Sequence, residues 1–317
     1  MNLSQFFKDD KILITGASGF VGKNLFNKFK SEGLNVIGTY FSKKFDDLIY
    51  CDLTDFNQLK KLFDEQNIKY VFMCNAKTYG AGTMKVDPNC LVRENLHMNS
   101  NILDLAYQYK VKKLMFISSS TIYQEANYPL CEEDLDLNKP TYKLYHGVGG
   151  GKRYTEQLCQ FYNSLGLNCN IIRPTGIYGP FDKHEEKKSH FMPAIIKRIL
   201  QKQDPLIIWG NGHSVRNMIY IEDLIRDMLK VFMNYDKPDA FNVCSDTTCT
   251  IRGIVDIILK LDNNKIEPIY DITKPDAIPY RNISRIKFDS YFGKEQYLSL
   301  EEGIKKVIEW LKIELGV

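Results

Sequence analysis

Short apolar runs alternate with longer amphipathic segments along the first half of this 317-residue chain. The runs that predict strands are rich in Ile, Leu, Val and Phe, and they cover residues 11–16, 35–40, 70–76, 113–120 and 168–175. Between them, apolar residues recur at helical spacing up to about Lys30 and over 56–66, 99–110 and 156–166. Strand alternating with helix in this way predicts an α/β fold, a doubly wound parallel sheet of the Rossmann type with helices on both faces.

After about Thr175 the pattern changes to loops rich in Gly, Pro and charge, mixed with apolar helices over 192–202, 252–261 and 301–313. We therefore expect a dinucleotide-binding domain over 1–175, to which parts of 210–245 return, and a smaller lobe formed mainly by 176–317. The lobe should cover the carboxyl ends of the strands, where ligands of such sheets bind.

Charge and hydropathy exclude several classes of partner. The 42 basic and 39 acidic residues leave a net charge of +3, which does not favour nucleic acid or a membrane surface as the main partner. No apolar run reaches the roughly 18 residues that span a bilayer, and the polar start MNLSQFFKDD is unlike a signal peptide. We expect a cytoplasmic protein.

The eight cysteines are scattered, without CxxC pairs or a His-Cys cluster at zinc-ligand spacing. In a reducing compartment such cysteines are small buried apolar residues, and no metal site is predicted.

The first predicted strand runs into the sequence TGASGFVG, residues 15–22. Its three glycines permit a tight turn, close approach of a pyrophosphate and close packing of helix on strand, and the helix start offers free N–H groups to the anion. The alternative is a merely structural turn, but the position near the start of a βαβ pattern favours dinucleotide binding. The predicted contacts are Gly16, Ser18, Gly19, Phe20, Val21 and Gly22.

The second strand ends in GTYFSKK without an Asp or Glu to accept from a ribose 2′-hydroxyl. Tyr40, Ser42 and Lys43 instead leave room for a 2′-phosphate, so NADP is slightly favoured, NAD stays open, and the alternative is a solvated basic turn. Asp52 and Leu53 follow the next strand-like run and are candidates to contact the adenine of the cofactor. The alternative for Asp52 is a helix N-cap.

Five motifs together resemble the extended short-chain dehydrogenases/reductases that modify nucleotide-linked sugars. They are TGASGFVG, FISSSTIY, the segment around Lys152, RPTGIYGP with Pro174, and WGNGHSVRNMIYIEDL, and the resemblance covers nearly the whole chain. Within the family the chain is most similar to GDP-fucose synthases and to enzymes of GDP-manno-heptose. The features that point there are Asn75-Ala76-Lys77 with a glycine-containing loop after the predicted strand, the run Ser118–Tyr123, and Ser189-His190-Phe191-Met192-Pro193-Ala194.

The resemblance implies a site with one departure. Ser119 and Lys152 match the serine and lysine of the family, but the proton-transferring tyrosine, four residues before the lysine, is replaced by Val148. His190 falls on the synthase's acid, whose cysteine partner corresponds to Thr121, a very weak acid.

Several groups are candidates to relay the proton in place of a tyrosine at position 148. They are Ser119, Thr121, Tyr123, His190 and a bound water. The glycines 149–151 cost about 2 to 3 kcal/mol in a helix, which suggests that cofactor or sugar passes close by.

The resemblance also implies a substrate site. Arg216 matches the arginine that grips the nucleotide diphosphate, and Arg281, Lys77 and Asn95 lie in regions that border the nucleotide sugar. Asn75, Ala76, Lys77, Lys152 and Pro174 are implied near the cofactor. Each of Arg281, Lys77, Asn95 and the KPDA turn 274–277 is equally well read as a surface residue.

The function implied is an NAD(P)-dependent oxidoreductase that transfers hydride at C4 of a GDP-linked manno-configured hexose or heptose, for a cell-surface polysaccharide. Oxidation is slightly preferred, because a reductase gains most from the missing acid. The alternatives are an epimerase or dehydratase that recycles a tightly bound cofactor, and a non-catalytic nucleotide-sugar-binding protein.

Dimerisation is also implied, through a four-helix bundle made by the helices holding 97–109 and 152–164. Leu103, Ala106, Leu158 and Phe161 are its candidate apolar positions, although a monomer core would use them equally well.

Overall fold

A seven-stranded, fully parallel sheet forms the centre of the computed structural model, which describes residues 2–44, 47–78, 88–185, 189–274 and 278–317. Its strand order is β10-β6-β5-β4-β1-β2-β3. The strands are β1 (Lys11–Thr15), β2 (Val36–Tyr40), β3 (Leu48–Tyr50), β4 (Ile68–Met73), β5 (Lys113–Ile117), β6 (Cys169–Pro174) and β10 (Ala240–Val243). The prediction of a doubly wound Rossmann-type sheet is confirmed.

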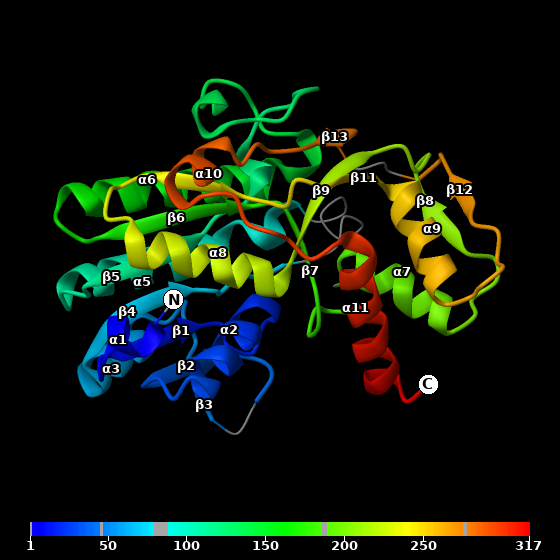
Figure 1. Ribbon diagram of the computed structural model, residues 1–317. Helices are drawn as coiled ribbons and strands as arrows, with labels where there is room; N and C mark the ends of the chain where they lie inside the picture. Colours follow the sequence, from blue (N-terminus) through cyan, green and yellow to red (C-terminus); the bar gives the residue numbers. More distant parts are fainter. Residues whose placement is uncertain (1, 45–46, 79–87, 186–188, 275–277) are drawn as a thin grey trace.

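Helices cover both faces of the sheet (Figure 1). One face carries α1 (Leu3–Phe7), α2 (Phe20–Ser31) and α8 (Ile221–Asn234), and the other carries α3 (Phe56–Gln66), α5 (Arg93–Gln108) and α6 (His146–Ser164). Successive residues of a strand point to opposite faces of the sheet. In β1, Ile12 and Ile14 pack against α1, α2 and α8, and Leu13 packs on the side of α3, α5 and α6. All three residues are fully buried, which explains the continuous apolar run of this strand.

Helix α1 lies in a stretch that the sequence pattern left without a predicted element. Phe7 is fully buried there, with its ring 5.5 Å from Phe29 of α2 and 5.9 Å from Phe232 of α8. The pair Phe6-Phe7 was the available signal, because two adjacent aromatics outside a strand need a core to pack against.

The second lobe gathers on the right of Figure 1, around short strands and three longer helices. The strands are β7 (Gly176–Tyr178), β8 (Ile207–Trp209), β9 (Val215–Tyr220), β11 (Thr248–Thr250), β12 (Ile269–Asp271) and β13 (Tyr280–Arg281). The helices are α7 (Phe191–Leu200), α9 (Ile251–Leu261) and α11 (Leu300–Leu315), with the shorter α10 (Ile286–Phe292) packed on β10 of the large sheet. The domain boundary at residue 175 stays a prediction.

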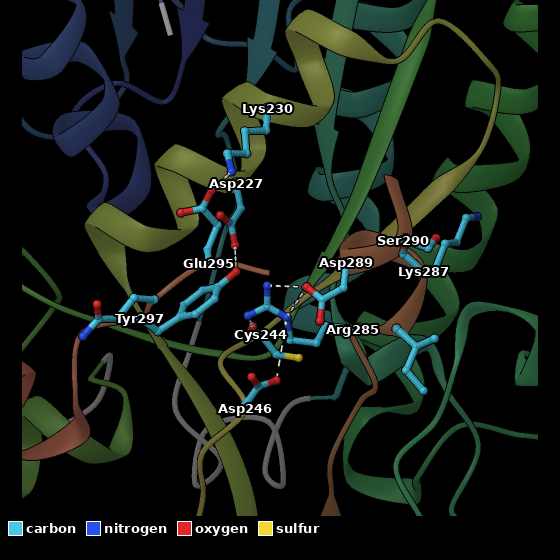
Figure 2. A network of polar contacts seen from close by, with 12 residues as sticks. Asp227, Lys230, Cys244, Asp246, Arg285, Lys287, Asp289, Ser290, Glu295 and Tyr297 are labelled. Atoms are coloured by element: carbon cyan, nitrogen blue, oxygen red, sulfur yellow. Dashed lines mark hydrogen bonds and ion pairs between the residues drawn. The ribbon is translucent and has the colours of Figure 1, made fainter. Parts of the chain in front are cut away.

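A buried polar network joins the C-terminal segment to α8 and to the end of β10 (Figure 2). Arg285 is 5% exposed, donates to Asp289 at 2.6 Å and lies 3.7 Å from Asp246. Tyr297 donates to Asp227 of α8.

The described cysteines are free, and most are buried. Burial raises the pKa of Cys51 and of Cys74 to about 12, so both thiols stay protonated at neutral pH. In the described ranges no helix is long and apolar enough to cross a bilayer. Those same ranges hold no group of three or more His, Cys, Asp or Glu that could bind a metal ion.

Candidate active site

The loop between β1 and α2 is shaped by its glycines. Gly16 has a φ of +65°, and a Cβ there would lie 2.8 Å from the Cα of Asn75. A Cβ on Gly22 would lie 2.3 Å from the carbonyl oxygen of Gly16, so only glycine lets the helix approach the strand end. Helix α2 starts after Gly19 without a side-chain cap, which leaves its first N–H groups for an anion. The loop, which contains Ser18, therefore fits the pyrophosphate of a dinucleotide, and Phe20 and Val21 lie in the first turn of α2.

This loop lies where the chain changes direction in the sheet, between the neighbouring strands β1 and β4. Thr15 donates to the Asn75 Oδ1 at 2.7 Å, Asn75 donates to the Asn99 Oδ1 at 3.1 Å, and Asn99 donates to the Thr155 Oγ1 at 3.2 Å. All four residues are buried. They tie β1 and β4 to α5 and α6, so Asn75 fixes the shape of the crevice. Asn99 and Thr155 were not predicted, and their only signal was a polar residue on the apolar face of a helix.

The edge of the sheet beyond β2 and β3 carries exposed aromatic rings. Phe41 is 61% exposed and stacks on Tyr50 with ring centroids 6.2 Å apart, and Tyr40 meets Tyr50 edge-on. Ser42 and Lys43 are exposed at the same strand end. The structure thus provides flat apolar surface beside a basic turn, as an adenosine with or without a 2′-phosphate requires.

Asp52 and Leu53 lie in the turn that precedes α3. The carboxylate of Asp52 accepts from the backbone N–H and the hydroxyl of Thr54, at 2.9 and 2.7 Å. Asp55, and not Asp52, is the N-cap of α3, so the capping alternative for Asp52 was wrong. Leu53 is buried in the core formed with α3 and α5.

The segment after β4 is held from α5. Asn95 accepts from the Lys77 N–H at 2.8 Å and donates to the Lys77 carbonyl at 3.1 Å, while the Lys77 side chain pairs with Glu94. Ala76 is exposed beside them. The predicted loop beyond residue 78, and residues 275–277 of the KPDA turn, lie outside the described residues.

Lys152 lies on α6 and reaches back to the end of β5. Its Nζ donates to the carbonyl oxygen of Ile117 at 2.6 Å, which places the ammonium beside the strand end that leads to Ser119. Burial lowers the pKa of Lys152 to about 8, and the nearby carboxylate of Glu156 opposes that shift only in part. The structure therefore brings Lys152 and the Ser119 strand end together, as the resemblance implies.

Val148 lies one helical turn before Lys152 and is half-buried. A Cβ on the next residue, Gly149, would lie 2.5 Å from the carbonyl oxygen of Thr121, so glycine is required there for α6 to pack against Ser120–Ile122. A Cβ on Gly150 would meet nothing within 4 Å. Contacts within the protein therefore explain why residue 149 is a glycine. They do not explain Gly150, which borders open space.

Ser119 and Thr121 form a hydroxyl pair in the turn after β5. The hydroxyl of Thr121 donates to Ser119 Oγ at 3.0 Å, and the Thr121 N–H donates to the same oxygen at 3.1 Å. Both side chains are half-buried, and Thr121 lines a small cavity with Tyr142, Tyr145 and Arg281.

The arrangement of Tyr123 does not favour the proton relay considered for it. The tyrosine is 3% exposed; its hydroxyl donates to Asn242 at 2.8 Å and accepts from Arg173 at 2.9 Å. Arg173 in turn is paired with the buried Glu156 at 2.8 Å. Burial raises the pKa of Tyr123, so its proton is held within a structural cluster.

Two arginines from adjacent strands lie side by side on one face. Arg216 of β9 is the register partner of Arg281 of β13 in a parallel pair, and partners in register point to the same side of a sheet. Arg216 is 5% exposed and donates to the Val215 carbonyl, and the guanidinium of Arg281 lies 5.5 Å from the Tyr145 ring centroid. Two arginines at paired positions of adjacent strands are side chains of the type that bind a diphosphate.

His190 immediately precedes α7 and contacts a buried carboxylate. Its Nδ1 lies 2.9 and 3.1 Å from the two carboxylate oxygens of Asp182, whose side chain is 1% exposed while that of His190 is 48% exposed. Burial opposes protonation of the ring, but the hydrogen bond and charge of Asp182 outweigh it and raise the pKa of His190. Lys183 and Arg281 act in the opposite direction.

These features define a class: a dinucleotide-binding α/β enzyme whose glycine loop, serine and lysine meet at the carboxyl edge of a parallel sheet. The chain belongs to the NAD dependent epimerase/dehydratase family, whose model matches residues 12–244. The predicted membership in the extended short-chain dehydrogenases/reductases, which are NAD(P)-dependent enzymes, is confirmed.

Relatives lie among enzymes of nucleotide sugars. The chain is 27% identical over 311 residues to a putative GDP-L-fucose synthase 2 of Arabidopsis thaliana, covering 96% of this chain and 92% of the relative. The crystal structure of a GDP-L-fucose synthetase from Naegleria fowleri bound to NADP has 25% identity and a TM-score of 0.83, covering 98% of this chain and 96% of that one. A GDP-6-OMe-4-keto-L-xylo-heptose reductase from C. jejuni shares the fold at 23% identity and a TM-score of 0.85, covering 96% and 98%.

Proposed function

We propose that this protein is an NAD(P)-dependent oxidoreductase that transfers hydride at C4 of a GDP-linked manno-configured hexose or heptose, preferentially as an oxidation. The observation that carries the proposal is the pairing of a retained Lys152, held beside the Ser119 turn, with a valine one turn before it. Orientation by the lysine serves hydride transfer, whereas the missing phenol removes the strong acid that reduction of a ketone needs most.

Each described group has a task in this proposal. The hydroxyl pair of Ser119 and Thr121 hydrogen-bonds the C4 oxygen, and the arginine pair of Arg216 and Arg281 binds the GDP diphosphate. His190 exchanges the proton, since its Nδ1 contacts Asp182, whose hydrogen bond and charge raise the pKa of the ring against the opposing effect of burial.

The cofactor supplies the hydride acceptor, and this chain's residues bind and orient it. The α2 N-terminus receives the pyrophosphate and Lys152 holds the nicotinamide ribose. We propose NADP over NAD, because Ser42 and Lys43 are exposed at the end of β2 and can meet a 2′-phosphate. Burial and then the positive charge of Lys43 lower the pKa of Lys23 on α2, so two basic groups act near this strand end. The solved relative from Naegleria fowleri is bound to NADP.

The direct test is turnover. Purified protein is incubated with GDP-mannose or a GDP-manno-heptose and NAD or NADP, and the absorbance of the reduced nicotinamide is followed, with UDP-glucose as the control substrate. We expect reduction of the cofactor with a GDP-sugar and not with UDP-glucose. The absence of turnover with every GDP-sugar tried, in both directions, would sink the proposal.

The same preparation separates the alternatives. A cofactor that survives purification, with an isomerised or dehydrated product formed without added nicotinamide, would replace the proposal by an epimerase or dehydratase. Binding of a GDP-sugar by calorimetry without any product would indicate a non-catalytic protein.

We also propose a homodimer through α5 and α6. Leu103 and Ala106 are fully buried in the monomer core, so these two positions are not available to a partner. Phe161 is 54% exposed and Tyr154 is 49% exposed on α6. These exposed rings are the apolar surface that a second copy would cover. Synthesis of a cell-surface polysaccharide is the setting that we propose for such an enzyme.

A further inference from the structure

We propose that Asp182 is a positioning residue for the reaction: it holds the His190 ring through Nδ1, so that Nε2 exchanges the proton with the C4 oxygen of the sugar. The inference rests on the proposed function for the identity of the proton's other partner. Its geometry stands independently, on two oxygen contacts of 2.9 and 3.1 Å between a 1% exposed carboxylate and a 48% exposed ring.

The Asp182 carboxylate has a further hydrogen-bond donor besides His190. One oxygen of Asp182 accepts from the N–H of Lys183 at 2.8 Å, and Lys183 Nζ donates to Thr78 at 3.2 Å. A carboxylate that is immobile and shielded from water orients a histidine better than an exposed one, because it has no competing solvent partner.

The backbone that delivers Asp182 is strained. Phe181, the residue before it, has a φ of +71°, a conformation that bulky side chains rarely adopt and that costs on the order of 1–3 kcal/mol. Its ring packs edge-on against Trp310 of α11 at 5.8 Å, and the ammonium of Lys23 lies 4.3 Å from the ring centroid. Local strain that is held in place by packing from two helices is typical of a functional segment.

The same segment is attached to the helix that begins at the glycine loop. Asn24 of α2, the residue after Lys23, donates to the carbonyl of Pro180 at 3.0 Å. Pro180 stands two residues before Asp182 in the chain. Helix α2 therefore supports both the phosphate loop at its start and the carboxylate that orients His190.

The chemistry of the step balances within the proposed reaction. On oxidation, the C4–H bond breaks as hydride leaves to the cofactor, the C4 hydroxyl proton moves to His190 Nε2, and the C4–O bond becomes a double bond. Asp182 stabilises the imidazolium that forms and keeps the neutral ring in the tautomer with hydrogen on Nδ1. Among the described residues, the charged groups that act on the ring are Asp182, Lys183 and Arg281.

The first measurement uses the unaltered protein without substrate. The chain has five histidines, so the ¹⁵N and ¹³C signals of His190 are assigned by their loss in His190→Asn. We expect the neutral ring to carry its hydrogen on Nδ1 and its pKa to lie above about 6.5. A neutral ring with hydrogen on Nε2 would overturn the proposal, whether or not any variant folds.

The second measurement compares Asp182→Asn with Asp256→Asn, the same substitution at an exposed position on α9. We expect Asp182→Asn to lower the His190 pKa, because the hydrogen bond and charge of Asp182 raise it. We expect kcat to fall at least about tenfold, with the acid limb of the pH–rate profile moving to lower pH by the same amount as the His190 pKa. Asp182→Glu should restore part of both effects. An unchanged His190 pKa in a folded Asp182→Asn variant would contradict the proposal.

The two proposals fail separately. If no GDP-sugar is turned over but the tautomer and pKa of His190 depend on Asp182, the function is wrong and the pair stands. If turnover is found and its pH profile is unaltered in Asp182→Asn, the function stands and the role of Asp182 is wrong.

Discussion

The three glycines at the start of α6 permit a quantitative test of what surrounds them. Alanine at an unstrained helix position is more stable than glycine by about 0.8–1.0 kcal/mol. A Cβ on Gly150 would meet nothing within 4 Å, and one on Gly151 would make only an ordinary contact, 3.8 Å from Leu96 Cδ2. We therefore expect Gly150→Ala and Gly151→Ala each to raise the free energy of unfolding by about 1 kcal/mol.

Gly149→Ala is the matched counterpart with the opposite sign. Its Cβ would lie 2.5 Å from the carbonyl oxygen of Thr121 and 2.9 Å from the Cγ2 of Thr141, so α6 must move away from the turn that carries Ser119. Overpacking of this kind costs about 1–3 kcal/mol, which exceeds the gain in helix propensity. Urea unfolding of all three variants at constant m-value measures the series. A destabilised Gly150→Ala or a stabilised Gly149→Ala would refute the reasoning.

Activity of the same variants then locates the ligand. If the sugar or cofactor passes close to Gly150, Gly150→Ala gains stability in the free protein and loses affinity for the ligand. Equal KM values in Gly150→Ala and the unaltered protein would limit the need for glycine to position 149, where the backbone of Thr121 already explains it.

Three further predictions concern α6 and its surface. Val148→Tyr should raise the turnover rate by about 100- to 10,000-fold if the site is intact and merely lacks the phenol; an unchanged rate relative to Val148→Phe would show that position 148 does not face the reacting atoms. The pKa of about 8 for Lys152 lies below the value of about 10.5 in the unfolded chain, so between these limits only the unfolded state binds the proton and stability rises with pH. From about pH 7 to about pH 10, unfolding free energies should therefore rise by about 2–3 kcal/mol more in the unaltered protein than in Lys152→Met, and parallel curves would contradict this. Phe161→Glu should convert a dimer into monomers in light scattering, whereas Ile313→Glu at an 83% exposed position on α11 should not; equal masses for both variants would exclude the α6 interface.

The sequence alone determined the architecture, because hydrophobic periodicity reports directly on burial. The α3 segment predicted over 56–66 is the helix observed, and the predicted strands reappear with shifts of a few residues at their ends. The position of the glycine loop could also be predicted from the sequence, since the close contacts at Gly16 and Gly22 exclude any side chain and therefore require glycine. The sequence also shows directly that Val148, and not a tyrosine, stands four residues before Lys152; that this is the position of the family's tyrosine stays a prediction.

Only the tertiary structure decided which polar groups act together. The pairing of Asp182 with His190 depends on a left-handed residue and on packing from α2 and α11, and no local pattern encodes those contacts. The same holds for Tyr123, which stands two residues after Thr121 in the sequence yet has its hydroxyl bound by Arg173 and Asn242. Backbone pattern follows from neighbours along the chain, whereas the protonation and orientation of a side chain follow from neighbours in space.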